Sequence, residues 1–149
     1  MIHFEGDMSF ALPVAEVATK LSDAGFLANS LQNVQVSEAT PDKAVWKQRS
    51  GFSFLSGSLN LEATVTAREA GKSVVFKIVN KVMGASSTVE TKLEFAEAGG
   101  GGTTVHWTGD LTAVTGFLRM LPKGLLEGSA KKVIEDVWAA VSQKLASPS

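Results

Sequence analysis

Only two side chains in this sequence, His3 and His106, could act as imidazole bases or as histidine ligands of a metal ion. Each lies in a segment where apolar and polar residues alternate, so both imidazoles are expected on the face opposite Phe4 and Trp107. No third ligand follows at a spacing typical of a metal site, and the chain has no cysteine. We interpret the two histidines as exposed surface residues, with a two-histidine metal pair as the alternative, and we expect no metal ion or other cofactor.

Other common catalytic signatures do not occur in the sequence. There is no Gly-X-Ser-X-Gly elbow to present a serine nucleophile, and Ser56 to Ser58 are expected to form a turn. The glycine run 99–102 joins two predicted strands and lacks the helix and lysine of a phosphate-binding loop. We therefore expect a hairpin tip there and no catalytic residues, so a role other than that of an enzyme is preferred.

The composition is that of one weakly charged domain covering residues 1–149. The chain has 14 Lys and Arg against 15 Asp and Glu, so its net charge of −1 gives no reason to expect a nucleic-acid partner. No uninterrupted apolar segment approaches the roughly 18 residues of a transmembrane helix. The N-terminus lacks a basic segment followed by an apolar one, which argues against a secretory signal. We expect a cytoplasmic protein, with peripheral membrane contact left open.

The periodicity of the sequence predicts the order of its elements. Residues 2–10 alternate and should form a half-buried strand. Two short helices follow over 13–22 and 24–31, with Asp23 as the N-cap of the second. Six strands joined by short turns come next, the first beginning at Asn33 and the others covering 43–54, 58–68, 73–83, 88–96 and 103–112. Short connections cannot join parallel neighbours, so these strands and the first one should form a seven-stranded antiparallel sheet.

A long amphipathic helix is predicted over residues 122–146, with Pro122 at its first position. Its apolar stripe consists of Leu126, Ala130, Val133, Ile134, Val137, Trp138, Val141 and Leu145. At about 1.5 Å per residue the helix is roughly 37 Å long, enough to cross a whole sheet. We therefore predict an α+β fold in which this helix packs across the concave face of the curved sheet. A straight helix on a curved sheet leaves space, which predicts an internal cavity.

The side chains predicted to line this cavity are mostly apolar, and each could equally belong to an ordinary core. Alternation and the helical stripe select Trp46, Phe52, Phe54, Leu59, Leu61, Phe76, Ile78, Phe95, Trp107, Val133, Val137 and Trp138. Four polar residues, Gln48, Ser50, Asn80 and Thr91, interrupt the inward-facing rows. They could orient a polar group of a ligand, contact buried water, or turn outward at a bulge.

The connector before the long helix is a second candidate region. It could be a gate, a docking patch or the buried start of the helix, and its apolar residues are Phe117, Leu118, Met120 and Leu121. Gly124 and Gly128 follow, and each costs about 1 kcal/mol in a helix relative to alanine. Close approach of the helix to the sheet or to a ligand would explain these glycines, as would a loosely wound first turn.

Several segments carry a resemblance to a known family. They are Phe4-Glu-Gly6, Leu21-Ser-Asp23, Phe26-Leu-Ala28, residues 102–111 and residues 116–138. In these segments the chain resembles the CoxG family of carbon monoxide dehydrogenase proteins, within the START and birch-pollen-allergen superfamily of helix-grip proteins. A Pro-Gly pair that is common in the family after the second helix is replaced here by Gln32-Asn33.

The resemblance implies a single START-like domain in which the strands of His3 and His106 are neighbours at the sheet edge. It also implies binding of an apolar small molecule or lipid-like ligand. The protein would then be an accessory factor to a carbon monoxide dehydrogenase or a related molybdenum hydroxylase, in contact with a dehydrogenase complex. Cyclases, dehydratases and hydrolases share the fold, so an enzyme is the alternative, and a docking adaptor with a filled core is the third hypothesis.

Overall fold

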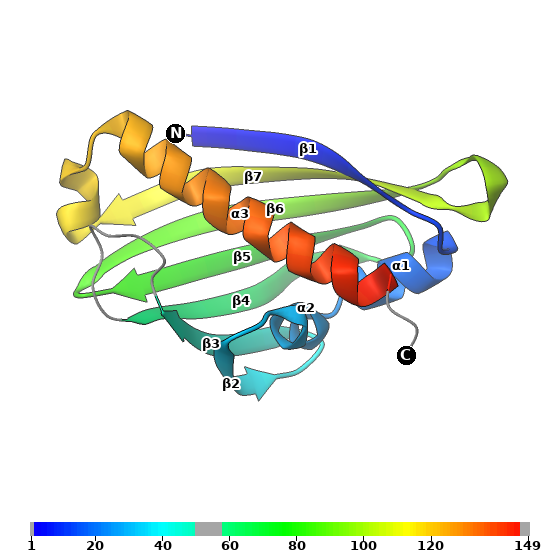
Figure 1. The fold of residues 1–149 in the computed structure, drawn as a ribbon, viewed down its shortest axis with the longest axis horizontal. Coiled ribbons are helices and arrows are strands. Elements are labelled where there is room, and N and C mark those ends of the chain that lie inside the picture. Colours follow the sequence, from blue (N-terminus) through cyan, green and yellow to red (C-terminus); the bar gives the residue numbers. More distant parts are fainter. Residues whose placement is uncertain (1, 50–57, 147–149) are drawn as a thin grey trace.

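The computed structural model describes residues 2–49 and 58–146, which form one curved antiparallel sheet crossed by a long helix (Figure 1). The strands follow the order β1-β7-β6-β5-β4-β3-β2 across the sheet. They are β1 (Ile2–Phe10), β2 (Val34–Ala39), β3 (Lys43–Arg49), β4 (Ser58–Glu69), β5 (Ser73–Val82), β6 (Ala85–Glu97) and β7 (Thr103–Thr115). The helices are α1 (Val14–Leu21), α2 (Ala24–Ser30) and α3 (Lys123–Ala146), with short 3-10 turns η1 (Gly99–Gly101) and η2 (Gly116–Met120). The predicted helix-grip fold with seven strands is confirmed.

Both short helices begin where the sequence predicts. Pro13 precedes α1 with φ −61°, the value that its ring imposes. The Asp23 carboxylate caps α2 by accepting a hydrogen bond from the backbone N–H of Phe26 at 3.0 Å. Val17 and Leu21 are fully buried, so α1 packs its apolar stripe into the core.

Two strand boundaries differ from the prediction. The β5–β6 connection is a two-residue turn in which Met83 has φ +50° and Gly84 has φ +79°. A type I′ hairpin requires positive φ at both of its central residues. Because the turn is this tight, β6 already begins at Ala85 and not at residue 88. At the same end of the sheet, β7 continues to Thr115, which pairs with Ser86.

One arginine that the sequence analysis did not single out fixes the position of the short helices against the sheet. Arg68, near the end of β4, donates from Nη1 to Asp42 Oδ1 at 2.9 Å. Its Nη2 donates to the carbonyl oxygens of Ser22 at 2.8 Å and Pro41 at 3.0 Å. The guanidinium thereby joins the α1–α2 junction and the β2–β3 turn to the same strand.

The long helix α3 is packed unevenly along its length. Near its C-terminal end Trp138, Val141 and Leu145 expose at most 8% of their surface. Nearer its start, the stripe residues Leu126 and Val133 are only partly buried. The predicted apolar stripe is thus confirmed, but the helix holds to the domain most firmly through its last turns. No helix within the described ranges has both the length and the hydropathy needed to cross a bilayer.

Gly6 leaves room for an aromatic contact between the sheet and α3. It pairs with Trp107 across β1 and β7, and a Cβ atom at residue 6 would lie 2.9 Å from the Trp107 indole. The ring centroids of Trp107 and Trp138 are 6.1 Å apart, with their planes tilted by 45°. Tilted aromatic pairs at this separation are favourable. Strands β1 and β7 and helix α3 therefore meet at one pair of indole rings.

Candidate functional site

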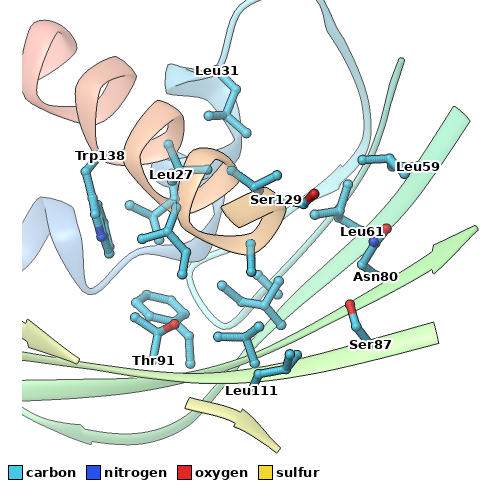
Figure 2. Close-up of a pocket in the computed structure, with 18 of the residues that line it drawn as sticks. Leu27, Leu31, Leu59, Leu61, Asn80, Ser87, Thr91, Leu111, Ser129 and Trp138 are labelled. Carbon is cyan, nitrogen blue, oxygen red and sulfur yellow. The ribbon is translucent and has the colours of Figure 1, made fainter. Parts of the chain in front are cut away.

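A partly open cavity of about 140 Å³ lies between the sheet, α2 and α3 (Figure 2). Sheet residues that line it are Trp46, Leu59, Leu61, Ala63, Phe76, Ile78, Asn80, Ser87, Val89, Thr91 and Leu111. Outside the sheet, the lining residues are Leu27, Leu31, Leu118, Leu121, Leu126, Ser129, Ala130, Val133, Ile134, Val137 and Trp138. An apolar protein cavity of about 150 Å³ is large enough to bind benzene. The cavity therefore matches an apolar group about the size of one ring.

The cavity wall contains no charged side chain among the described residues. Its polar groups are the Asn80 amide, the hydroxyls of Ser87, Thr91 and Ser129, and two indole N–H groups. A buried ion without a partner of opposite charge is strongly destabilised. The wall therefore suits an uncharged molecule.

Eight of the apolar residues that the sequence predicts for the cavity wall do line it. They are Trp46, Leu59, Leu61, Phe76, Ile78, Val133, Val137 and Trp138. Asn80 and Thr91, two of the polar residues that interrupt the inward-facing rows, also face it. Alternation along the strands and the stripe of α3 were sufficient to find these positions. That they contact a ligand stays a prediction.

Three sheet residues were wrongly assigned to the cavity wall. The Gln48 Oε1 atom accepts a hydrogen bond from Trp46 Nε1 at 3.0 Å, so this amide is engaged within β3. Phe95 and Trp107 belong to the core, but the cavity does not extend to them. Trp107 packs against Trp138 instead. Phe52 and Phe54, and likewise Ser50, lie outside the described residues.

The assignments in the connector and the first turns of α3 are also corrected. Phe117 packs against the core without reaching the cavity, and Met120 is 85% exposed. Leu118 and Leu121 line the cavity in their place. The reason is η2, because residues three apart share a face in a 3-10 turn. Of the three alternatives for the connector, the buried start of the helix describes Leu118 best.

Gly124 and Gly128 do not make a close approach to anything. Both are exposed, and a Cβ atom at either position would have no neighbour within 4 Å. The explanation by close contact with the sheet or with a ligand site in the wall is therefore wrong. Their effect is on the helix itself. Glycine is less favourable than alanine in a helix, and no close packing contact at these two positions compensates for this cost.

We expect Gly124→Ala and Gly128→Ala each to stabilise the protein by about 1 kcal/mol, because both positions are helical with open space around them. Urea unfolding followed by far-UV circular dichroism measures the change. An unchanged midpoint would mean that these turns are not helical in the free protein.

Sequence reasoning did not single out the contribution of α2 to the site, and in α3 it selected Gly124 and Gly128 where the lining residues are different ones. Leu27 and Leu31 reach the cavity from α2 and its C-cap, and Ser129 and Ala130 reach it from α3. The spacing of four between the two leucines was a usable signal, because residues four apart share a helix face. Ala130 belongs to the predicted stripe but is too small to suggest a wall residue.

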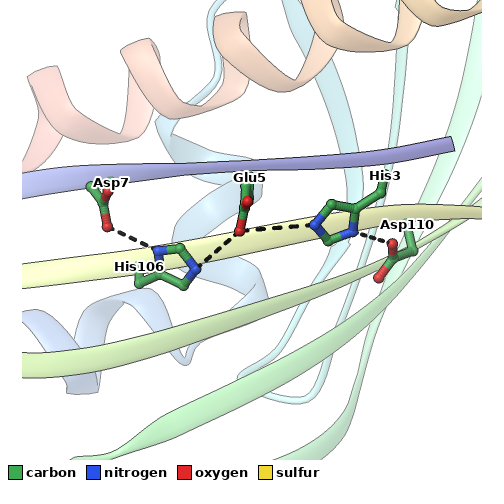
Figure 3. Close-up of polar contacts among 5 residues, drawn as sticks. All are labelled: His3, Glu5, Asp7, His106 and Asp110. Atoms are coloured by element: carbon green, nitrogen blue, oxygen red, sulfur yellow. Dashed lines mark hydrogen bonds and ion pairs between the residues drawn. The ribbon is translucent and has the colours of Figure 1, made fainter.

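The two histidines lie in a polar cluster on the exposed face of β1 and β7 (Figure 3). His3 Nδ1 lies 2.5 Å from Asp110 Oδ1, and His106 Nδ1 lies 2.9 Å from Asp7 Oδ1. The Glu5 carboxylate stands between them, 3.9 Å from His3 Nε2 and 3.5 Å from His106 Nε2. The predicted surface position and the neighbouring strands are confirmed. Within residues 2–49 and 58–146, no three such side chains are arranged to hold a metal ion.

The cluster predicts a small pH dependence of stability. The hydrogen bond to Asp110 raises the pKa of His3, aided by the charges of Asp110 and Glu5. The pKa of His106 is raised first by the hydrogen bond to Asp7 and then by nearby carboxylates. A histidine whose pKa is raised by folding stabilises the protein fully below the unfolded pKa of about 6.5. That contribution is lost as the pH rises through the folded pKa.

We therefore expect the melting temperature to decline as the pH rises from about 6 to about 8. The decline should be small because the cluster is exposed. Differential scanning calorimetry of the wild type and of a His3→Gln, His106→Gln variant measures it. The variant should lack this part of the pH dependence, and identical profiles would show that the cluster contributes nothing.

The fold and the site together define a helix-grip protein with a cavity beneath its long helix that has no charged side chain among the described residues. The sequence matches a protein family described as polyketide cyclase / dehydrase and lipid transport over residues 1–146. The chain belongs to this family. No curated protein sequence matches it significantly.

Solved structures share this architecture at low sequence identity. A conserved protein from Geobacillus kaustophilus superposes with a TM-score of 0.80 at 18% identity, over 97% of this chain and 95% of that one. A START superfamily protein from Mycobacterium smegmatis gives a TM-score of 0.68 at 10% identity, over 96% of each chain. At these identities the likeness establishes the fold, and function has to be argued from the site.

Proposed function

We propose that the protein binds an uncharged hydrophobic small molecule or lipid-like ligand in the cavity beneath α3, without catalysing a reaction on it. The observation that carries the proposal is the cavity itself, which is walled by apolar side chains and lacks a charged group among the described residues. The family description, which includes lipid transport, supports it. Removal of apolar ligand surface from water would supply the affinity, at about 25 cal/mol per Å².

The same observations weigh against the other two hypotheses. A cyclase, dehydratase or hydrolase needs an acid or base that reaches the ligand. The histidines of the described chain lie on the exposed face of the sheet. A docking adaptor with a filled core would leave no room for a cavity of about 140 Å³. From the sequence resemblance alone, we propose an accessory role to a carbon monoxide dehydrogenase or related molybdenum hydroxylase as the setting of ligand binding.

Native mass spectrometry of protein purified without detergent tests the proposal. We expect a bound apolar species that organic extraction releases, and a rise in melting temperature with members of a neutral apolar ligand panel. Lipid and quinone analysis of the extract identifies its class. A protein that carries no bound species and shows no thermal shift with the panel would contradict ligand binding.

A further inference from the structure

Two buried polar atoms of the cavity wall have no hydrogen-bond partner within the described protein. They are Asn80 Oδ1 and Trp138 Nε1. A buried polar atom without a partner is destabilising, and such atoms are rare in folded proteins. These are the only two side-chain atoms of this kind in the described residues, and both belong to residues that line the same cavity.

The two atoms differ in what they require. An indole N–H can only donate, so Trp138 needs an oxygen that accepts, and a carbonyl oxygen, which has no competing donor role, meets this need. The Asn80 amide has an acceptor oxygen and a donor nitrogen, and these can exchange places by rotation of the amide. A hydroxyl group suits Asn80 in either orientation because a hydroxyl both donates and accepts. A carbonyl oxygen suits Trp138.

The two polar residues also lie at different ends of the cavity. In Figure 2, Trp138 borders one end of the cavity, while Asn80, Ser87 and Ser129 lie towards the other. Asn80 and Ser87 are direct partners across β5 and β6, so a second hydroxyl lies beside the amide. Mainly apolar side chains lie between the two ends. The wall is therefore polar at two separated points and apolar between them.

We propose that the cavity selects an uncharged molecule with an apolar middle, a hydroxyl group at the Asn80 end and a carbonyl oxygen at the Trp138 end. The inference rests on the proposed ligand-binding function and adds the chemical class of the ligand, a hydroxy-ketone or hydroxy-ester. A plain hydrocarbon would fill the space and leave both polar atoms without partners. A site built to hydrogen-bond a group discriminates against analogues that lack it, because its own buried groups then stay unpaired.

Four probes with one skeleton test this selection: 4-hydroxyacetophenone, acetophenone, 4-ethylphenol and ethylbenzene. They carry both polar groups, the carbonyl alone, the hydroxyl alone and neither. Isothermal titration calorimetry should rank the first tightest and ethylbenzene weakest, with a loss of roughly fivefold for each missing group. Equal affinities for all four would overturn the inference while leaving the apolar binding function intact. Binding of none of them would contradict both.

Single variants assign each preference to its residue. Trp138→Phe keeps an aromatic ring against Trp107 but removes the donor, so it should abolish the advantage of acetophenone over ethylbenzene. Asn80→Leu should abolish the advantage of 4-ethylphenol over ethylbenzene. Trp107→Phe and Asn60→Leu are the matched controls, because neither residue lines the cavity. Preferences that persist in Trp138→Phe and Asn80→Leu would overturn the assignment.

Stability of the ligand-free protein gives an independent readout. Because Asn80 Oδ1 is buried without a partner, Asn80→Leu should raise the melting temperature of the free protein by about 2 to 4 °C while it weakens hydroxyl binding. Asn60 is exposed, so the control Asn60→Leu should leave the melting temperature unchanged. A lower melting temperature in Asn80→Leu would show that the amide is already satisfied, which would overturn its assignment to a ligand.

Discussion

Replacement of Ala130 by phenylalanine should strongly weaken ligand binding and leave the fold intact. Ala130 lines the cavity from α3 and is partly buried, so a phenyl ring at this position enters the space that a ligand would occupy. Loss of apolar contact equivalent to one buried side chain, about 1.5 to 3 kcal/mol, weakens binding by at least roughly tenfold.

The same substitution should not reduce stability. The new ring buries apolar surface in an existing cavity, and this gain exceeds the cost of roughly 0.5 kcal/mol for phenylalanine in a helix. Calorimetric titration with the ligand recovered from the protein measures binding, and urea unfolding measures stability. Ala139→Phe on the exposed face of α3 is the matched control and should bind normally. Normal binding by Ala130→Phe would show that the ligand site lies elsewhere.

Gly116→Ala should cost about 3 kcal/mol of folding stability. Gly116 begins η2 with φ +66°, which costs roughly 1 to 2 kcal/mol for an L-residue with a side chain. A Cβ atom there would also lie 2.8 Å from Ala85 Cβ and 2.9 Å from Ala85 Cα. The backbone of β6 has to shift to relieve this contact, and overpacking of this kind costs about 1 to 3 kcal/mol.

Gly100→Ala separates the two costs. Gly100 has φ +79°, but a Cβ atom there has no neighbour within 4 Å, so only the conformational cost applies. Chemical denaturation of both variants should show a larger loss at Gly116. The expected consequence for the site is a shift of Leu118, which η2 holds against the cavity. Equal losses in the two variants would mean that the contact with Ala85 is relieved freely.

The sequence determined the elements of this fold better than the position of its cavity. Alternation of apolar residues reports the face of a sheet to which a side chain belongs. It does so correctly for β7 and for β4 as far as Val65, after which a register shift leaves Ala67 exposed. It does not report how far along that face a residue lies. Phe95 and Trp107 were assigned to the cavity for this reason, although the cavity does not reach them.

Local backbone conformation was the other source of error. The 3-10 turn η2 decides that Leu118 faces inward and that Met120 does not, and no periodicity in the connector indicates it. Asn33 gives the opposite lesson. Its φ of +61° is a conformation that asparagine tolerates better than most residues, so the residue type itself was a usable signal for this backbone conformation.

The placement of the indole rings means that the intrinsic tryptophan fluorescence of the protein reports on the cavity. The chain has three tryptophans and no tyrosine. Trp46 and Trp138 line the cavity, and Trp107 packs against Trp138. All of the protein's intrinsic tryptophan emission therefore originates in the cavity wall or one ring away from it. A ligand that enters the cavity changes the surroundings of these fluorophores directly, so occupancy can be followed by emission without an attached dye.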